Sequence, residues 1–416
     1  MRYIDRGPSE SHPSMPQPAV APSAPQIPDI DELIIQQAQR LSDELQAHRL
    51  SIFPPTAQKP LRSFSLAEAA KFLGTNGTHL RNLSLRGKGP LPDLTPTNRR
   101  KYSAEQIQGL REWLAEHGAP GRRYSPRRKG AEHLQVIVVA NFKGGSAKTT
   151  TTAHLGQHLA LRGYRVLALD LDPQASLSAL HGFQPELDLG PSETLYGAIR
   201  YTDPRPLTEI ILRTNFPGLH IVPAHIELTE FEYETPKALT DGQPGRIFFT
   251  RLTNVLQSVA GEYDVVVIDC PPQLGYLTML ALCAATAVLI TVHPQMLDVM
   301  SMSQFLLMMG AGVLAPLKKA GAVLNIDWMR YLITRYEPMD VPQTQMIQLL
   351  RAMFGDYVLS NPMLKSVAIE DASVTKQTLY EVDRQQFTSA TYDRAMSCLD
   401  AVNGEIEALI NTAWGR

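Results

Sequence analysis

From about residue 134 onward, short runs of consecutive apolar residues alternate with amphipathic segments. The strand candidates are Val136–Ala140, Val166–Leu169, Leu219–Val222, Val265–Ile268, Ala287–Val292 and Tyr331–Thr334. A strand without a polar face must be covered on both sides, and the amphipathic segments between the strands can supply that cover. The pattern predicts an α/β fold with a doubly wound, mostly parallel sheet, whose ligands bind where loops leave the carboxyl ends of strands.

A glycine-rich loop follows the first of these strand candidates. It reads Asn141-Phe-Lys-Gly-Gly-Ser-Ala-Lys-Thr-Thr150 and precedes an amphipathic segment. Backbone N–H groups at the start of a helix bind phosphate oxygens, while a lysine adds charge and a threonine binds magnesium. The strict P-loop pattern requires glycine at positions 142 and 147, where this chain has phenylalanine and alanine. The loop therefore has the chemistry of a phosphate site without the standard motif.

The loop resembles the deviant Walker A motif, Lys-Gly-Gly-x-Gly-Lys-Thr-Thr, of the ParA/MinD family of partition and positioning ATPases. Other matches to that family are Asp170-Leu-Asp-Pro-Gln174, Val265-Val-Val-Ile-Asp-Cys-Pro-Pro272, Phe354-Gly-Asp356, Pro362 to Ala372 and Tyr380-Glu381. Together they span residues 134–416, which the resemblance identifies as a P-loop NTPase domain. The layout of the whole chain resembles the RepA partition proteins of repABC-type plasmid operons.

The resemblance implies a site for ATP and Mg²⁺. The nucleotide-binding residues that it implies are Lys143, Gly144, Gly145, Ser146, Ala147, Lys148, Thr149 and Thr150. It places Lys148 on the β- and γ-phosphates and Thr150 on the α-phosphate, and it makes Lys143 the signature lysine that reaches into the partner protomer's site. Phosphoryl transfer needs positioning and charge neutralisation more than covalent chemistry, which agrees with these residue types.

The resemblance also implies roles for three carboxylates. Asp269 holds magnesium through water, together with the hydroxyl of Thr149. Asp172 orients the attacking water, so Lys143, Lys148 and Asp172 are the catalytic candidates. Asp170 is expected to have a structural or magnesium-shell role.

Ala147 departs from the family motif, which has glycine there. If the loop requires a positive φ at this position, alanine carries a strain of order 1 kcal/mol. We expect that strain to weaken nucleotide binding or to slow turnover.

The residues ahead of the sheet fall into segments of different composition. Residues 1–28 hold seven prolines, which predicts a disordered tail. Residues 29–50 carry apolar residues at three- and four-residue steps, which predicts an amphipathic helix. Its apolar stripe needs a cover, either another copy of the helix or the chain's own folded part.

Residues 60–120 have the layout of a winged helix-turn-helix. Capping boxes at Ser65–Glu68 and Ser103–Gln106 predict the first and third helices, a short helix is expected over 77–85, and a Gly- and Pro-rich stretch between helices two and three predicts a wing. The order of parts resembles the DNA-binding domain of MerR-type regulators. The alternative is a three-helix oligomerisation module.

Charge supports DNA binding by this region. The chain has a formal net charge of −2, yet residues 81–129 hold 12 Lys or Arg and 4 Asp or Glu, a local charge of +8. Such clustering is typical of a phosphate-contacting surface. The DNA-binding candidates are Thr78, His79 and Arg81 in the groove, Arg99, Arg100 and Lys101 over phosphates, and Lys365 in the ATPase domain for nonspecific contact. Residues 121–133 are interpreted as a basic, solvated linker, with added phosphate contacts as the alternative.

Other features bear on the compartment. Three cysteines without a CxxC pair exclude a disulfide scaffold and a sequence-evident zinc or iron–sulfur site. The first residues lack the apolar segment of a secretory signal. Prolines and a glycine interrupt the uncharged stretch 270–297, which predicts a loop, a buried helix and a core strand instead of a membrane span. We expect a cytoplasmic, nucleoid-associated protein with no membrane partner.

The resemblance implies a plasmid partition ATPase. In that family ATP closes a homodimer, the dimer binds nucleoid DNA, and a ParB-type centromere-binding partner stimulates a slow hydrolysis. The N-terminal module adds operator binding and autoregulation. A different class of function is a DNA-binding repressor whose ATPase has become slow or inactive, which Ala147 favours. A third is a MinD-like membrane-positioning ATPase, and the three acidic residues within 399–416 argue against it.

Overall fold

The computed structural model describes residues 29–52, 59–118, 124–241 and 248–416. The expected tail over 1–28 lies outside the described residues, as do residues 121–123 of the linker. The chain divides into two compact units, residues 1–58 and 59–416. In the first unit the helix α1 (Ile30–Ile52) confirms the predicted helix and exposes Ile30, Ile34 and Leu41. What covers its apolar stripe stays open.

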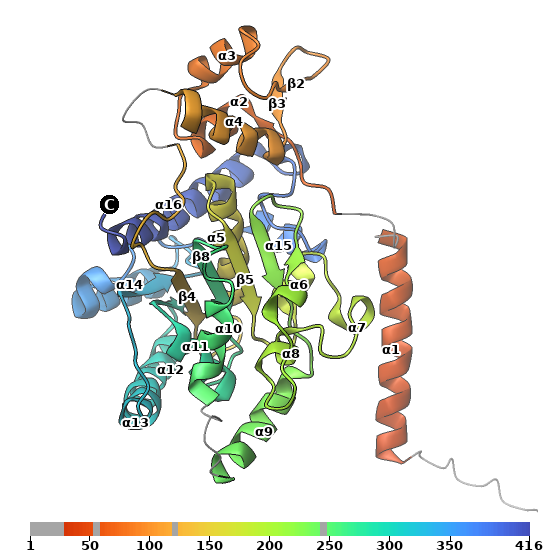
Figure 1. Cartoon of the computed structure of the whole chain (residues 1–416), viewed down its shortest axis with the longest axis vertical. Helices are drawn as coiled ribbons and strands as arrows, with labels where there is room; N and C mark the ends of the chain where they lie inside the picture. The colour runs from red at the N-terminus through yellow and green to blue at the C-terminus, as the bar shows by residue number, and fades with distance from the viewer. Residues whose placement is uncertain (1–28, 53–58, 119–123, 242–247) are drawn as a thin grey trace, which may run out of the picture. The chain divides into compact units, whose positions relative to one another are not determined.

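The second unit is built around a seven-stranded sheet (Figure 1). Its order is β10 (Trp328–Ile333), β9 (Ala287–Val292), β4 (Gln135–Ala140), β8 (Val265–Asp269), β5 (Val166–Asp170), β7 (Leu219–Val222) and β6 (Leu212–Arg213). The six predicted strands are present and pair in parallel. The short edge strand β6, which we did not predict, pairs antiparallel with β7.

Helices cover both faces of this sheet. They are α5 (Lys148–Arg162), α6 (Ser176–Leu180), α7 (Pro185–Asp188), α8 (Leu195–Ile199), α9 (Leu228–Thr240), α10 (Arg251–Gln257), α11 (Tyr276–Ala284), α12 (Met296–Leu307), α13 (Ala315–Lys319), α14 (Val341–Phe354), α15 (Val367–Val374) and α16 (Ser389–Ala413). Alternate residues of β4 enter opposite cores: Ile137 packs with α5 and α16, whereas Val138 packs with α11 and α12. The doubly wound fold is therefore confirmed.

Helix α12 continues through a π-helical turn (Met308–Leu314) into α13. By length and composition alone the stretch Met296–Lys319 could cross a membrane, a test that core helices of soluble proteins also pass. Phe305, Met309 and Leu317 are buried in the core of the second unit. The uncharged stretch 270–297 forms a loop, α11 and β9, as predicted.

The N-terminal module, residues 59–118, has the predicted order of elements. It contains β1 (Phe64–Ser65), α2 (Leu66–Phe72), α3 (Gly77–Leu85), β2 (Asp93–Leu94), β3 (Arg100–Tyr102) and α4 (Ala104–His117). Both capping boxes form with their reciprocal hydrogen bonds. Strands β2 and β3 make an antiparallel hairpin at the position expected for the wing.

The module packs onto the sheet domain within one compact unit. Phe72 and Leu114 of the module and Leu159 of α5 belong to one contiguous apolar cluster. The interpretation of the following residues as a solvated linker is wrong for part of the described segment: Tyr124 is buried, and Arg128 donates hydrogen bonds to the carbonyls of Ala260 and Tyr263, whereas residues 129–131 are exposed. A loop between two domains folds onto one of them when it finds partners for its polar groups there, and composition does not reveal those partners.

Candidate functional site

The glycine-rich loop lies between the carboxyl end of β4 and the first residue of α5. It borders a hollow of about 480 Å³ at the carboxyl edge of the sheet. The lining residues are Gly144, Gly145, Ser146, Ala147, Lys148, Thr149, Thr150, Asp172, Ser176, Ala179, Leu180, Pro272, Ser373 and Lys376. A hollow at a helix N-terminus, lined by loop backbone, is suited to binding phosphate groups.

Ala147 caps α5 with a left-handed backbone, at φ 64° and ψ 29°. The loop therefore does require a positive φ at this position, which was the condition for strain. Gly145, with φ 74°, adopts the same region at no cost. The strain expected at Ala147 is of order 1 kcal/mol, which the fold of the loop overcomes.

Lys148 is the buried cation of the hollow. Its Nζ donates a hydrogen bond to the carbonyl of Lys143 at 3.1 Å, which folds the side chain back along the loop. Burial lowers the pKa of Lys148, although the carboxylate of Asp269 counteracts part of that effect. Lys148 forms no ion pair with the residues that the structure describes, so its charge is available to an anionic ligand.

Thr149, which lines the hollow, contacts the buried Asp269. The hydroxyl of Thr149 donates to Oδ2 of Asp269 at 2.6 Å. The other carboxylate oxygen, Oδ1, is buried and has no hydrogen-bond partner among the residues that the structure describes. Burial, and then the charge of Asp170, raise the pKa of Asp269 well above its ordinary value. A hydroxyl beside a carboxylate with an unused oxygen fits a magnesium ion, because that ion prefers hard oxygen ligands.

Asp170 lies opposite Asp269 in the register of β5 and β8. Its Oδ2 accepts hydrogen bonds from the backbone N–H and the hydroxyl of Ser178, both at 2.8 Å, and its Oδ1 accepts from the N–H of Asp172. Burial raises the pKa of Asp170 to about 7. Both oxygens of Asp170 accept hydrogen bonds within the chain. Of the two roles considered for Asp170, structural or magnesium-shell, this arrangement supports the structural one.

Asp172 borders the hollow itself and is partly exposed. Its Oδ1 accepts a hydrogen bond from the N–H of Gln174 at 3.0 Å. Burial raises the pKa of this carboxyl, and the hydrogen bond and Lys148 oppose the shift. A carboxylate placed beside the phosphate loop can accept a proton or orient a water molecule.

Lys143 turns away from the hollow of its own chain. It forms an ion pair with Asp298 at the start of α12. The lysine side chain is 42% exposed and the aspartate 10%. Lys143 is therefore not among the residues that line the hollow, and its ammonium is held by Asp298, while Gly144 to Thr150 lie together around the hollow.

The sequence analysis missed several residues that hold the loop in place. Thr334, directly after β10, donates its hydroxyl to the carbonyl of Ser146 at 3.0 Å. Arg335, with φ 54°, donates to the carbonyl of Gly145 at 3.1 Å. Thr291 of β9 donates to the hydroxyl of Ser146. Polar residues at the ends of two predicted parallel strands were the available signal.

A second hollow, of about 330 Å³, adjoins the first and shares part of its lining. Arg335, Ser366 and Thr378 are among the residues that line it. Lys365 also borders this hollow and pairs with Glu337 at 3.0 Å. The structure therefore places Lys365 beside the candidate nucleotide site.

The other DNA-binding candidates lie on one part of the N-terminal module. Thr78 and Arg81 of α3 are exposed, as is Arg99 before β3, whereas His79 and Lys101 are half-buried. Arg100 donates a hydrogen bond to the hydroxyl of Ser84 and so joins the hairpin to α3. These residues belong to α3 and the hairpin, which Figure 1 shows on the side of the module away from the sheet.

This chain is similar in sequence and in fold to known proteins. A family model described as an AAA domain matches residues 134–311. A protein of Sinorhizobium fredii named "Putative replication protein A" is 57% identical over 403 residues, which cover 96% of this chain and 98% of the relative. Protein SopA of Escherichia coli K12 is 30% identical over 377 residues, which cover 86% of this chain and 92% of SopA.

Solved structures show the same fold at lower identity. A structure described as a partition protein covers 88% of this chain and 98% of its own, with a TM-score of 0.55 at 18% identity. Apo McdA from Cyanothece covers 66% of this chain and all of its own, with a TM-score of 0.53 at 20% identity.

Proposed function

The chain belongs to the ParA/MinD family of ATPases, and we propose that it is the ATPase of a plasmid partition system of the repABC type. ATP closes a homodimer, the dimer binds DNA, and a ParB-type partner stimulates a slow hydrolysis. The observation that carries the proposal is the contact between Thr149 and Asp269, which lies beside Lys148 and the glycine-rich loop with its left-handed Ala147. The protein is expected in the cytoplasm, associated with the nucleoid.

ATP and Mg²⁺ are the ligands of this site. The loop backbone and Lys148 hold the phosphates, and Thr149 and Asp269 hold the metal, whose charge neutralises phosphate oxygens. Asp172 orients the attacking water from its place at the edge of the hollow. Lys143 leaves Asp298 and enters the partner protomer's site. Each chain contributes an incomplete site, so hydrolysis depends on the dimer.

The N-terminal module binds the operator of the chain's own operon. Thr78, His79 and Arg81 contact base edges, and Arg99, Arg100 and Lys101 contact phosphates. Exposure of Thr78, Arg81 and Arg99 supports this assignment. Lys365 contributes nonspecific contacts, and its ion pair with Glu337 must open for that role. A Lys365→Glu variant whose nonspecific DNA binding keeps its affinity and its salt dependence would remove Lys365 from the DNA surface.

Size-exclusion chromatography with light scattering, with and without ATP and Mg²⁺, tests the proposal. The expected result is a nucleotide-dependent increase to the mass of a dimer, which Lys148→Ala abolishes. Because α1 can associate independently of nucleotide, the informative quantity is the change on adding ATP. If the chain binds ATP but its molar mass does not change, the proposal is contradicted.

The alternative is a DNA-binding repressor with an inactive ATPase. The observation that favours it is the strained alanine at position 147. Measuring ATP hydrolysis with and without duplex DNA decides between them. DNA-stimulated hydrolysis that Asp172→Ala removes would exclude the repressor, and its complete absence would favour it.

A further inference from the structure

The chain segment that enters the N-terminal module and the segment that leaves it are each held by an arginine, and a third arginine joins the module directly to the ATPase domain. We refer to Arg62, Arg111 and Arg416 as the clamp arginines. Each donates hydrogen bonds to backbone carbonyls, so each contact depends on the positions of main-chain atoms.

Arg111 of α4 lies in the interface between the module and α5. It is 5% exposed. Its guanidinium donates to the carbonyls of Phe72 at 3.0 Å and Leu161 at 2.7 Å, near the carboxyl ends of α2 and α5. Carbonyls at helix ends lack intrahelical partners and carry partial negative charge, which suits a buried cation. A Cβ at Gly163 would lie 2.2 Å from Nε of Arg111, so position 163 must stay glycine.

Arg62 holds the segment that enters the module. Its Nε donates to the carbonyl of Tyr380 at 3.0 Å, and its guanidinium also donates to the hydroxyl of Tyr392 on α16. Three residues earlier, Lys59 pairs with the buried Glu381 and donates to the carbonyl of Leu180 at 2.6 Å. The entry to the module is therefore attached to α6 and to the region of α16.

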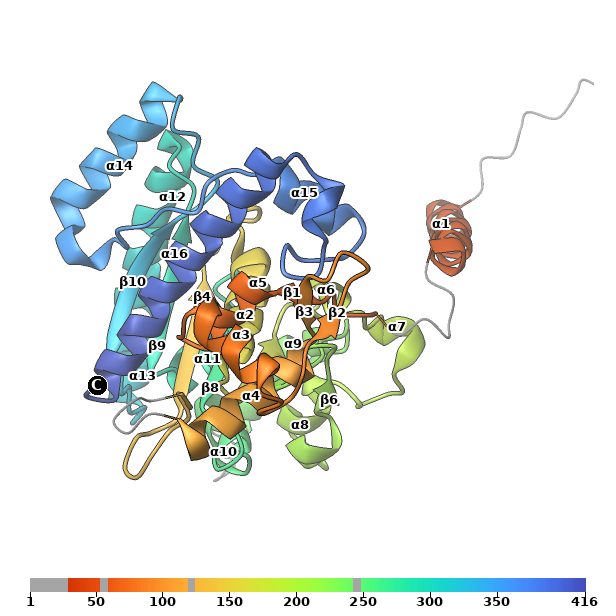
Figure 2. The ribbon, with the colours of Figure 1, turned by 90° about the horizontal axis from the view of Figure 1, so that it is seen from above.

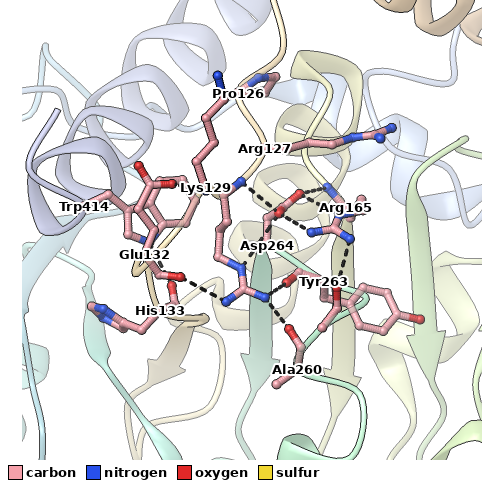
Figure 3. Close-up of polar contacts among 12 residues, drawn as sticks. Pro126, Arg127, Lys129, Glu132, His133, Arg165, Ala260, Tyr263, Asp264 and Trp414 are labelled. Carbon is pink, nitrogen blue, oxygen red and sulfur yellow. Dashed lines mark hydrogen bonds and ion pairs between the residues drawn. The ribbon is translucent and has the colours of Figure 1, made fainter.

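Arg416 holds the segment that leaves the module, and Figure 3 shows Pro126, Arg127 and Glu132 of that segment. It pairs with Glu132 and donates to the carbonyls of Pro126 at 2.8 Å and Arg127 at 3.0 Å. Its guanidinium lies 4.6 Å from the ring centroid of Trp414, whose indole N–H donates to the carbonyl of His133. The sequence-based interpretation of this segment as solvated thus fails at several successive residues.

Arg128, in the middle of the same segment, is attached to the sheet domain. Its guanidinium donates hydrogen bonds to the carbonyls of Ala260, Tyr263 and Glu132. Its backbone N–H donates to the buried carboxylate of Asp264, which also accepts from Arg165 at 2.7 Å. Burial of Asp264 requires these partners, because an unpaired buried carboxylate is costly.

Helix α16 and the residues that follow it take part in the contacts of Arg62 and Arg416. It packs along α5, as Figure 2 also shows. Tyr392 contacts Arg62, Asp400 pairs with Lys71 of α2, Glu407 pairs with Arg162, and Trp414 follows the helix end. One helix therefore supports both connections of the module and its docking surface, and the shared apolar cluster continues beneath them.

We propose that the N-terminal module and the ATPase domain move as one rigid body, held by the clamp arginines, so that DNA on α3 keeps a fixed orientation to the nucleotide site. In the ATP-closed dimer two modules then have one separation. The dimer accordingly prefers one spacing between two half-sites of duplex DNA. The DNA and dimer parts rest on the proposed function, whereas the rigid body rests on the contacts above.

Distance measurement by pulsed electron spin resonance tests the rigid body without DNA. Spin labels are placed on the full chain at Asn82 of α3 and Lys318 of α13 through a non-canonical amino acid, so the native cysteines stay. One narrow distance distribution is expected. Arg416→Ala should broaden this distribution about twofold or more, and Arg416→Lys should broaden it less. Arg384→Ala, at an exposed position, is the control and should leave the distribution unchanged. A broad distribution for the native chain would overturn the rigid body, and an unchanged distribution for Arg416→Ala would overturn the role assigned to Arg416 in holding it.

Half-site spacing tests the consequence. The native chain with ATP first selects duplexes from a random library. The spacing between the two half-sites of a selected duplex is then lengthened or shortened one base pair at a time. The native chain should prefer one spacing by about tenfold or more, and Arg416→Ala should lose most of that preference while keeping ATP affinity. Equal binding at all spacings would overturn the fixed orientation. If no duplex is selected, operator binding itself is wrong, and the distance measurement alone decides the rigid body.

Discussion

Lys143 of the phosphate loop is held by Asp298, a residue of its own chain at the start of α12. A lysine that acts in a partner's site must first break this ion pair. The pair is half-exposed on the lysine side, so its contribution is small, of order 1 kcal/mol or less. It is weak enough to open when a phosphate group of the partner's nucleotide offers a better anion.

The two loop lysines are expected to separate nucleotide binding from dimer closure. Lys148→Ala should abolish ATP binding, because the hollow loses its buried cation. Lys143→Ala should bind ATP with native affinity but fail to dimerise or hydrolyse it. Calorimetric titration and light scattering measure the two steps. Asp298→Asn, which frees Lys143, is the matched variant and should dimerise at lower ATP concentration. Native dimerisation and turnover by Lys143→Ala would make the chain an ordinary P-loop enzyme.

Removal of the carboxylate at position 172 should trap the dimer. Asp172 borders the hollow and accepts a hydrogen bond from Gln174, whereas Thr149 and Asp269 bond to each other, so Asp172→Ala should leave phosphate and metal binding in place. Hydrolysis should fall by about a hundredfold or more, and the ATP dimer should stay on DNA. The lifetime of the DNA complex after dilution measures this effect. Rapid release from DNA by this variant would be inconsistent with the role assigned to Asp172.

Replacing Ala147 with glycine should stabilise the protein. Glycine adopts φ 64° without the Cβ penalty, so the free energy of unfolding should rise by about 0.5 to 1 kcal/mol. Ala153→Gly inside α5 is the control and should destabilise the protein by about 1 kcal/mol, since it has no such strain to relieve. Urea unfolding followed by circular dichroism compares the two variants. Equal destabilisation by both would show that Ala147 carries no strain.

Arg81 and Arg99 should affect DNA binding differently. Arg81 is exposed on α3, and Arg99 is exposed before β3 of the hairpin. Arg81→Ala should reduce the preference for a selected duplex over random DNA, at a cost of about 1 to 3 kcal/mol. Arg99→Ala should weaken both kinds of DNA alike and lower the salt slope by about 1. Fluorescence anisotropy across a salt series measures both effects, and identical behaviour of the two variants would contradict the assignment.

Glu407 should make the free energy of unfolding depend on pH. Burial alone would raise its pKa, but His158 and Arg162 outweigh burial and lower the pKa to about 2. Since the ordinary value is 4.5, the stabilisation is complete above that pH and is lost as pH falls toward 2. Glu407→Gln should lose roughly 3 kcal/mol at pH 7, and the difference from the native chain should shrink below pH 4.5.

Urea unfolding at several pH values tests this dependence on Glu407. Asp393→Asn, which removes an exposed ion pair with Arg384, is the control and should change stability little at any pH. A loss in Glu407→Gln that is the same at pH 7 and pH 3 would show that the charge of this carboxylate is not what stabilises the fold.

Much of the fold was accessible from the sequence because its signals are local. The six parallel strands are continuous apolar runs, and the capping boxes at Ser65 and Ser103 join residues three apart. The two-residue strand β6 carries too short a pattern to detect. Of the site, the loop and the aspartates at strand ends were predicted, whereas Thr334 and Arg335 were missed because only the sheet brings them to Ser146 and Gly145.

The sequence by itself determined the chemistry of the phosphate loop, the sheet that carries it and the elements of the N-terminal module. Each depends on residues a few positions apart, through backbone geometry and apolar periodicity. Only the packed fold decides that Ala147 is left-handed, that Lys143 pairs with Asp298, that Arg111 holds the module against α5, and that Arg416 holds the segment after the module. Those contacts join residues far apart in the chain, and a charged side chain finds its partner only after the sheet and its helices have packed.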